Sequence, residues 1–143
     1  MGICTFFVHR DSPEELMPEL RCEVEKLIRS GEAQIFYVGN QGRFDGMALR
    51  VLREMKERYP FIRYAVVLAY LPTGKAGQEE TFLPEGIETV PRRFAISFRN
   101  RWMLRQAQSV IVNVEHSWGG AAQAAQSAER LGKRVIYLGK IRE

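Results

Sequence analysis

A strand-to-helix junction in the C-terminal third of the sequence has the residue types of an anion-binding site. The apolar, β-branched run at residues 110–114 is typical of a buried strand, and the alanine-rich residues 121–131 are typical of a helix that Gly132 ends. Gly119 and Gly120 directly precede that helix. The first N–H groups of a helix point outward, and glycine lets an anion approach them closely. The junction therefore predicts a site for a phosphate or a carboxylate.

The residues before the two glycines add groups that could contact a nucleotide. His116 and Ser117 are polar side chains in the predicted loop, and Trp118 could either stack on a base or cover the helix end. Glu115 and Asp45 are candidate acceptors for ribose hydroxyls or, alternatively, general bases. Asp45 could equally cap the N-terminus of a helix.

Two further loops follow predicted strands and are expected to meet this junction. In a parallel sheet, ligands bind outside the carboxyl ends of the strands, near the point where the strand order reverses. The loop that starts at Gly39 lacks the glycine spacing of dinucleotide or phosphate-loop motifs, so it could also be an ordinary tight turn. The candidate binding residues of the two loops are His9, Arg10, Gly39, Asn40, Gln41 and Gly42.

An arginine-rich segment lies before the junction. Arg93, Arg99 and Arg101 could each form bidentate contacts with a phosphate or a carboxylate. The alternative is a solvated basic face on a helix, which fits Arg105 well. The segment therefore offers candidate charge partners without choosing among them.

Alternating strand and helix patterns surround these loops. Continuous apolar strands separated by amphipathic helices are typical of parallel sheets with right-handed crossovers. The sequence therefore predicts an α/β fold, a three-layer Rossmann-like domain with a mostly parallel sheet of about five strands. Ser12 or Asp11 is predicted to cap the first helix, with Pro13 at its first position. The predicted strands are residues 3–8, 34–38, 63–70, 110–114 and 135–138, and the predicted helices are residues 13–30, 47–55, 93–108 and 121–131.

Residues 71–92 interrupt this alternation with several prolines and glycines. A loop of this length in a compact domain is usually functional or mobile, although surface loops also tolerate insertions that have no role. We predict a long loop here and leave both interpretations open.

Composition restricts the class of partner. The chain has 143 residues, of which 45% are apolar and 27% charged, and this suits one domain spanning residues 1–143. The net charge of +4 comes from 21 basic residues interleaved with 17 acidic ones. A local anionic ligand is therefore favoured over a nucleic-acid surface. No apolar run approaches the roughly 18 residues that cross a bilayer, and we expect a cytoplasmic protein without a membrane partner.

The cysteines and histidines do not form a metal-binding pattern. Cys4 and Cys22 fall in a predicted strand and a predicted helix without CxxC spacing, so both are predicted to be buried free thiols. His9 and His116 are the two histidines of the chain and have no further ligands at suitable spacing. We therefore predict no metal site and no bound cofactor.

Taken together, these motifs make nearly the whole chain similar to a known family. The chain resembles the YpsA-like family of the SLOG superfamily, a Rossmann-like group that also contains the LOG phosphoribohydrolases and the core domain of DprA. The resemblance implies a site for a nucleotide derivative of the ADP-ribose or NAD-derived kind, with a role in signalling or conflict systems. The matching stretches are residues 4–11 (CTFFVHRD), 36–45 (FYVGNQGRFD), 66–72 (VVLAYLP), 84–88 (PEGIE), 91–97 (PRRFAIS), 99–100 (RN) and 116–122 (HSWGGAA).

Two departures from the family pattern affect the expected chemistry. Val8 stands where members usually carry a glycine before the His-Arg pair, and its side chain could restrict the approach of a phosphate. The LOG pattern of two glycines followed six residues later by a glutamate places that carboxylate at Gln126. An amide can neither act as a base nor stabilise an oxocarbenium ion as a carboxylate does. The resemblance therefore implies binding rather than hydrolysis.

The prediction is a protein that binds a phosphorylated nucleotide derivative. The glycine turns would hold phosphates, Arg10 and Arg99 would be charge partners, and Asn40 and Asp45 would contact the ribose. One alternative is a LOG-type hydrolase that cleaves the N-glycosidic bond of nucleoside monophosphates. A second is single-stranded DNA binding of the DprA type, although nucleic acid is the less expected partner. A homodimer is also an expectation, since many α/β domains of this size pair through helices.

Overall fold

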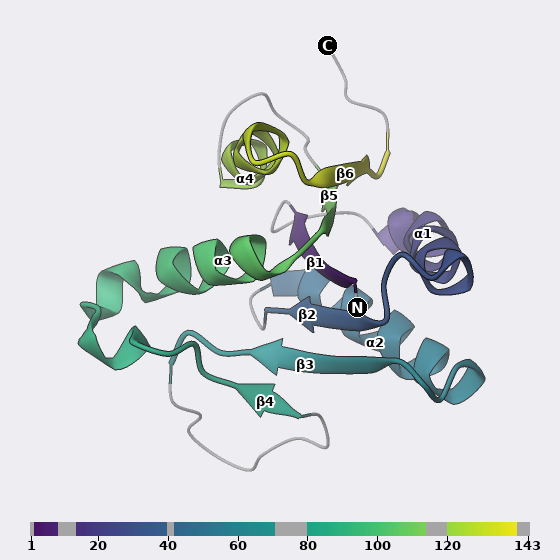
Figure 1. Ribbon diagram of the computed structural model, residues 1–143, viewed down its shortest axis with the longest axis horizontal. Coiled ribbons are helices and arrows are strands. Elements are labelled where there is room, and N and C mark those ends of the chain that lie inside the picture. Colours follow the sequence, from purple (N-terminus) through teal and green to yellow (C-terminus); the bar gives the residue numbers. More distant parts are fainter. Residues whose placement is uncertain (1, 9–13, 40–41, 71–79, 114–119, 140–143) are drawn as a thin grey trace.

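The computed structural model describes residues 2–8, 14–39, 42–70, 80–113 and 120–139. Within them, six strands form one sheet with helices on both faces (Figure 1). The strands are β1 (Ile3–Val8), β2 (Ile35–Val38), β3 (Arg63–Val67), β4 (Thr81–Phe82), β5 (Ser109–Asn113) and β6 (Arg134–Tyr137). The helices are α1 (Met17–Ser30), α2 (Gly42–Arg58), α3 (Ala95–Gln106) and α4 (Gly120–Arg130), and the short 3-10 turns are η1 (Glu14–Leu16), η2 (Ile87–Thr89) and η3 (Arg92–Phe94).

The strand order contains one reversal. The order across the sheet is β4-β3-β2-β1-β5-β6, and every neighbouring pair is parallel. The chain starts in the middle of the sheet, moves outward to β4, and then returns to place β5 on the other side of β1. The reversal therefore lies between β1 and β5, whose last residues, Val8 and Asn113, are register partners. The predicted Rossmann-like α/β fold is confirmed.

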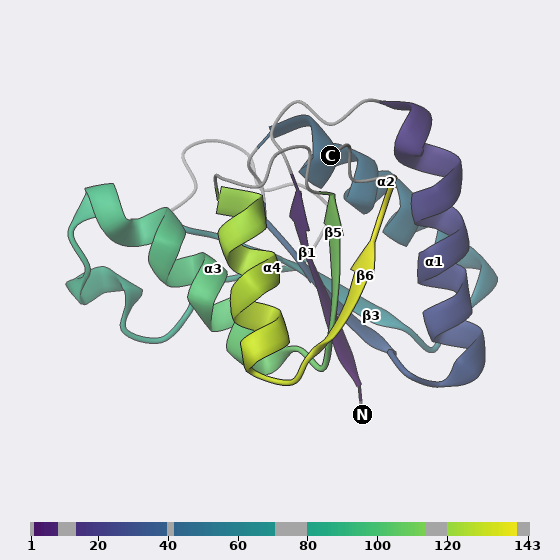
Figure 2. The same ribbon diagram turned by 90° about the horizontal axis from the view of Figure 1, so that it is seen from above.

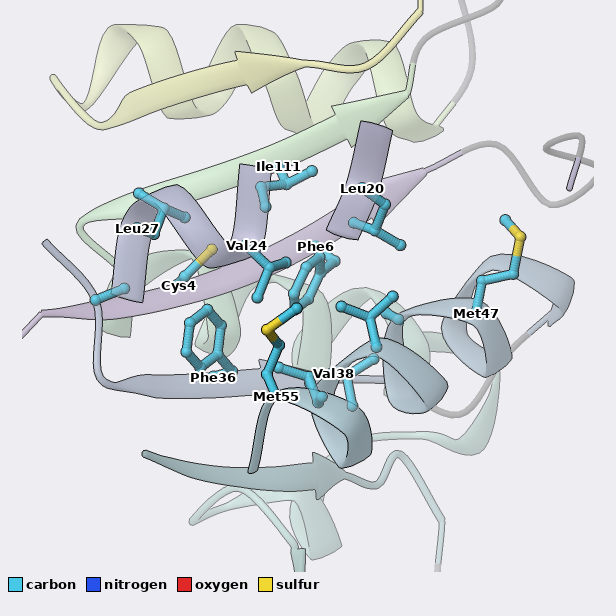
Figure 3. Close-up of a cluster of buried hydrophobic side chains, with 14 of the residues drawn as sticks. Cys4, Phe6, Leu20, Val24, Leu27, Phe36, Val38, Met47, Met55 and Ile111 are labelled. Atoms are coloured by element: carbon cyan, nitrogen blue, oxygen red, sulfur yellow. The ribbon is translucent and has the colours of Figure 1, made fainter. Parts of the chain in front are cut away.

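The helices form two outer layers. α1 and α2 cover one face of the sheet, and α3 and α4 cover the other (Figure 2). Successive strand residues alternate between these layers, so Phe6 joins the core under α1 and α2, whereas Phe7 joins the core under α3 and α4. The core under α1 and α2 contains large side chains from both helices and from β1, β2 and β5 (Figure 3).

The helix boundaries follow recognisable local signals. Helix α1 ends at Gly31, which has a left-handed φ of 79° and donates its N–H to the carbonyl of Ile28 at 3.1 Å. The start differs from the prediction, because the α-helix begins at Met17 after the turn η1 and not at Pro13. The proposed caps Ser12 and Asp11 lie outside the described residues.

The long loop predicted at residues 71–92 contains more structure than expected. Its described part includes the edge strand β4 and the turn η2. The N–H of Val66 donates to the carbonyl of Glu80 at 2.8 Å, and that of Leu68 donates to the carbonyl of Phe82 at 2.8 Å. A strand of two residues is too short to produce a periodic pattern, so the sheet has six strands instead of about five.

The prediction for the cysteines is correct for one thiol only. Cys4 is buried in β1, but Cys22 is exposed on α1. Leu20, Val24 and Leu27 define the buried side of α1. Position 22 lies about 200° around the helix from position 20, which places it on the outer side. The burial prediction is therefore wrong for Cys22.

None of the described helices is both long and apolar enough to cross a membrane.

Candidate functional site

The described ends of the predicted glycine turns, Gly39, Gly42 and Gly120, lie at the carboxyl edge of the sheet. β1 and β5 end side by side at the strand reversal, and Gly39 directly follows β2, next to β1. Helix α2 begins at Gly42 and helix α4 begins at Gly120, so both N-termini are at this edge (Figure 2). The positive ends of two helix dipoles therefore lie at the same edge of the sheet as the strand reversal. This combination is where α/β sheets bind anionic ligands.

The structure describes part of the predicted site. Gly39 is buried, and the backbones of Gly42 and Gly120 begin helices. The candidate residues that lie outside the described ranges are His9, Arg10, Asn40, Gln41, Glu115, His116, Ser117, Trp118 and Gly119.

Asp45 lies in the first turn of α2 and not at the capping position, which precedes Gly42. It is the fourth residue of α2, because the helix already begins at Gly42. A capping residue precedes the first helical turn, so the interpretation of Asp45 as an N-terminal cap is wrong. The ribose contact proposed for it remains a prediction.

Arg99 places a buried positive charge at the carboxyl edge of the sheet. It is only 3% exposed, and it is the one buried charged residue in the described part of the chain. Its Nη1 donates to the carbonyl of Val67, the last residue of β3, at 3.5 Å, and its Nε donates to Oδ1 of Asn100 at 3.2 Å. Since Val66 pairs with Val38, the guanidinium lies beside the carboxyl ends of β3 and β2.

The position of Arg99 follows from the periodicity of α3. Ala95, Arg99 and Met103 recur every four residues and form the buried side of this helix. Burying a guanidinium is costly unless its donors are satisfied, so a cation on a buried stripe indicates a specific requirement for charge. Among the predicted arginines, this spacing separates Arg99 from the others.

The remaining arginines of this segment fit the solvated-face alternative. Arg93 is exposed and lies over the ring of Phe94, with its Cζ 4.8 Å from the ring centroid. Arg101 and Arg105 are also exposed on α3. Of the three candidates in this segment, the resemblance singled out Arg99, and among these three Arg99 is the one that is buried beside the carboxyl end of β3.

Asn113 is a buried polar residue at the strand reversal that the sequence reasoning missed. It is 6% exposed, and its Nδ2 donates to the carbonyl of Leu138 at 3.1 Å, which ties the ends of β5 and β6 together. Next to it, the N–H of Gly139 donates to the carboxylate of Glu19 at 2.6 Å. The available signal was a polar residue at the end of an otherwise apolar strand.

The described groups at and near the site give no sign of metal or thiol chemistry. No group of three metal-ligating side chains occurs in the described ranges. Burial raises the pKa of the Cys4 thiol well above its ordinary value, so this thiol stays protonated. It also lies near the amino end of β1, away from the carboxyl edge.

Two comparisons with known proteins gave no relative. No protein-family model matches this chain, and no curated protein matches it.

Proposed function

We propose that this protein binds a phosphorylated nucleotide derivative, of the ADP-ribose or NAD-derived kind, at the carboxyl edge of the sheet. The observation that carries the proposal is Arg99, a buried guanidinium beside the ends of β3 and β2. A planar guanidinium can form paired hydrogen bonds with phosphate oxygens. In a buried setting such bonds are stronger than in water.

The helix starts support the same ligand. Gly42 and Gly120 begin the two helices whose N-termini lie at this edge, and neither residue has a Cβ that would keep a phosphate from the backbone. A diphosphate has two charged groups, which suits two helix N-termini better than a single anion would. The resemblance to the YpsA-like family leads to the same ligand class, with His9, Arg10 and Trp118 as further proposed contacts.

Binding without hydrolysis is the form of the proposal that α4 supports. Gln126 is six residues after Gly120, so it lies about 9 Å further along the helix axis, and it is exposed. It is an amide at the position where the LOG pattern has a carboxylate. Hydrolysis of an N-glycosidic bond needs a carboxylate close to the sugar. The hydrolase alternative would therefore need another acid from this chain.

Calorimetric titration of the wild type with ADP-ribose, NAD and AMP tests the proposal. We expect one of these compounds to bind, and Arg99→Met to weaken that binding at least about tenfold, the effect of losing one charge-assisted hydrogen bond. Methionine fills much of the same space without the charge. The matched control is Arg93→Met, on the exposed start of the same segment, which should stay within about twofold of the wild type.

Two results would contradict the proposal. The first is an absence of binding by all three nucleotides. The second is equal weakening by Arg99→Met and Arg93→Met, which would show that general basic charge is sufficient. Chromatography of the same mixtures checks for free base, and its release by the wild type would favour the hydrolase alternative instead.

A further inference from the structure

A hollow of about 370 Å³ lies between the C-terminal halves of α3 and α4. Its volume is within the range of pockets that accept a small ligand or a few side chains of a partner. We call it the arginine groove. Its lining residues are Arg101, Leu104, Arg105, Ser127, Arg130 and Leu131.

The arginine groove is separate from the carboxyl edge. Helix α3 ends at Gln106, just before the start of β5, and helix α4 ends at Arg130, just before the start of β6. Both helix ends therefore lie toward the amino edge of the sheet, where Figure 2 shows them side by side. A ligand here would not touch the helix N-termini that we propose for the nucleotide.

Among the described residues, the three arginines of this groove share the lack of a carboxylate partner with Arg29, Arg92 and Arg93, and they differ from these in lining one hollow. Within the part of the chain that the structure describes, Arg101, Arg105 and Arg130 form no ion pair. Arg130 reaches only the hydroxyl of Ser127, at 3.5 Å. The arginines that do pair with a glutamate are Arg21 with Glu54, Arg50 with Glu14, Arg58 with Glu25, Arg63 with Glu80 and Arg134 with Glu32.

Helix stability explains only part of this cluster. Arg105 and Arg130 are in the last turns of their helices, where a cation complements the helix dipole. Arg101 is one turn earlier, and Leu131 is 57% exposed on the same groove. An exposed leucine that lines the same hollow as three arginines does not stabilise a helix end. It is the arrangement expected of a surface that binds an amphipathic anion.

We propose that the arginine groove docks an acidic, amphipathic segment of another protein. Glutamates or aspartates of the segment would pair with Arg101, Arg105 and Arg130, and an apolar side chain would lie against Leu104 and Leu131. Carboxylates match the guanidinium fork, and arginine is enriched at protein interfaces. A groove between two helices is a common seat for such a segment.

Charge and surface chemistry favour this occupant over two others. A second copy of this chain is a weaker match, because Glu14, Glu25 and Glu54 on the surface of η1, α1 and α2 already pair with arginines of their own chain. A nucleic acid needs a basic track with aromatic platforms for its bases. The groove has leucines in place of aromatic rings.

The test uses a synthetic helical peptide of about four turns, with glutamates beside leucines at i, i+3 and i+4 spacing. Titration into the isotopically labelled full chain is followed by amide chemical shifts. We expect the largest shifts in the second halves of α3 and α4. Arg105→Glu should weaken binding at least about tenfold, and Leu131→Ser about threefold or more. Arg105→Gln provides a milder variant that leaves no repulsive charge at the helix end.

The matched control is Arg29→Glu. Arg29 is exposed in the last turn of α1, so it shares the helix-terminal position of Arg105 but is on the opposite layer. Its affinity for the peptide should stay within about twofold of the wild type. A peptide with glutamine in place of glutamate should bind at least about tenfold more weakly.

Three outcomes would overturn the docking proposal. They are shifts spread over all basic surfaces, equal losses in Arg105→Glu and Arg29→Glu, and a single-stranded oligonucleotide that binds the groove more tightly than the peptide. None of these outcomes bears on nucleotide binding at the carboxyl edge, which is measured with separate ligands and with Arg99→Met.

Discussion

The two faces of the sheet are packed with different kinds of side chain. Under α1 and α2, the core consists of large apolar residues, and Phe6 stacks on Phe36 with ring centroids 6.4 Å apart. Under α3 and α4, the core contains alanines, namely Ala125 and Ala128 of α4 and Ala107 after the end of α3, together with Met103 and Leu104 of α3. The second face also contains the buried Arg99 of α3.

This difference separates the larger apolar core from the layer that contains the buried Arg99 and the arginine groove. Burial of large apolar side chains supplies most of the free energy of folding, so the face under α1 and α2 can maintain the sheet. The small residues of α4 allow this helix to pack closely on the strands and leave its outer surface to polar groups. Both the carboxyl-edge arginine and the arginine groove belong to the layer of α3 and α4.

The largest expected effect is on the face under α1 and α2. Leu20 is fully buried there, and Leu20→Ala should lower the free energy of unfolding by about 3 kcal/mol, through lost burial and a residual cavity. Urea unfolding followed by circular dichroism measures the change. Leu131→Ala is the control, because a leucine that is 57% exposed should cost less than about 0.5 kcal/mol.

A smaller effect is expected from a buried polar contact on the other face. The hydroxyl of Thr5 donates to the carbonyl of Tyr37 at 2.9 Å and lies 3.5 Å from the sulfur of Met103. Thr5→Val removes this hydrogen bond and should cost about 1 kcal/mol in urea unfolding. Thr5→Ser retains the hydroxyl but lacks the methyl group, so it measures how much the methyl group contributes to stability apart from the hydrogen bond. A cost for Thr5→Val as large as that for Leu20→Ala would remove the contrast between the faces.

The sequence was sufficient to predict every strand except β4. β1 occupies the predicted residues 3–8, and β5 and β6 each lie within one residue of their predicted bounds. Buried parallel strands are continuous apolar runs, which are visible without any knowledge of their neighbours. β4 was missed because two residues contain no periodicity, and its pairing depends on the distant β3.

The candidate site could be predicted only in outline. The strand ends and glycine turns are local features, so their meeting at one edge followed once the strands were taken as parallel. Strand order is non-local, and no local pattern placed the reversal between β1 and β5. The burial of Arg99 could have been inferred from its four-residue spacing with Ala95 and Met103, whereas the arginine groove depends on how α3 packs beside α4.

The smallest expected effect is a pH dependence at the outer edge of the α3 and α4 layer. The hydroxyl of Tyr137 on β6 donates to the carboxylate of Glu129 on α4. This hydrogen bond, followed by partial burial and the charge of Glu129, raises the pKa of Tyr137 to about 12. The ordinary pKa of tyrosine is about 10, so the folded state holds this proton more tightly than the unfolded state does.

The contribution of Tyr137 to stability is therefore complete below about pH 10 and is lost as the pH rises to about 12. Urea unfolding of the wild type and Tyr137→Phe across this range measures the difference, which should shrink as the pH rises. In Glu129→Gln, the ultraviolet absorbance of the phenolate should report a lower pKa for Tyr137, because an amide is a weaker acceptor and has no charge. If the difference in the free energy of unfolding between the wild type and Tyr137→Phe does not change with pH, the hydrogen bond from Tyr137 to Glu129 does not stabilise the contact between β6 and α4. The attachment of α4 to the sheet would then come from apolar packing, to which Ala125 and Ala128 belong.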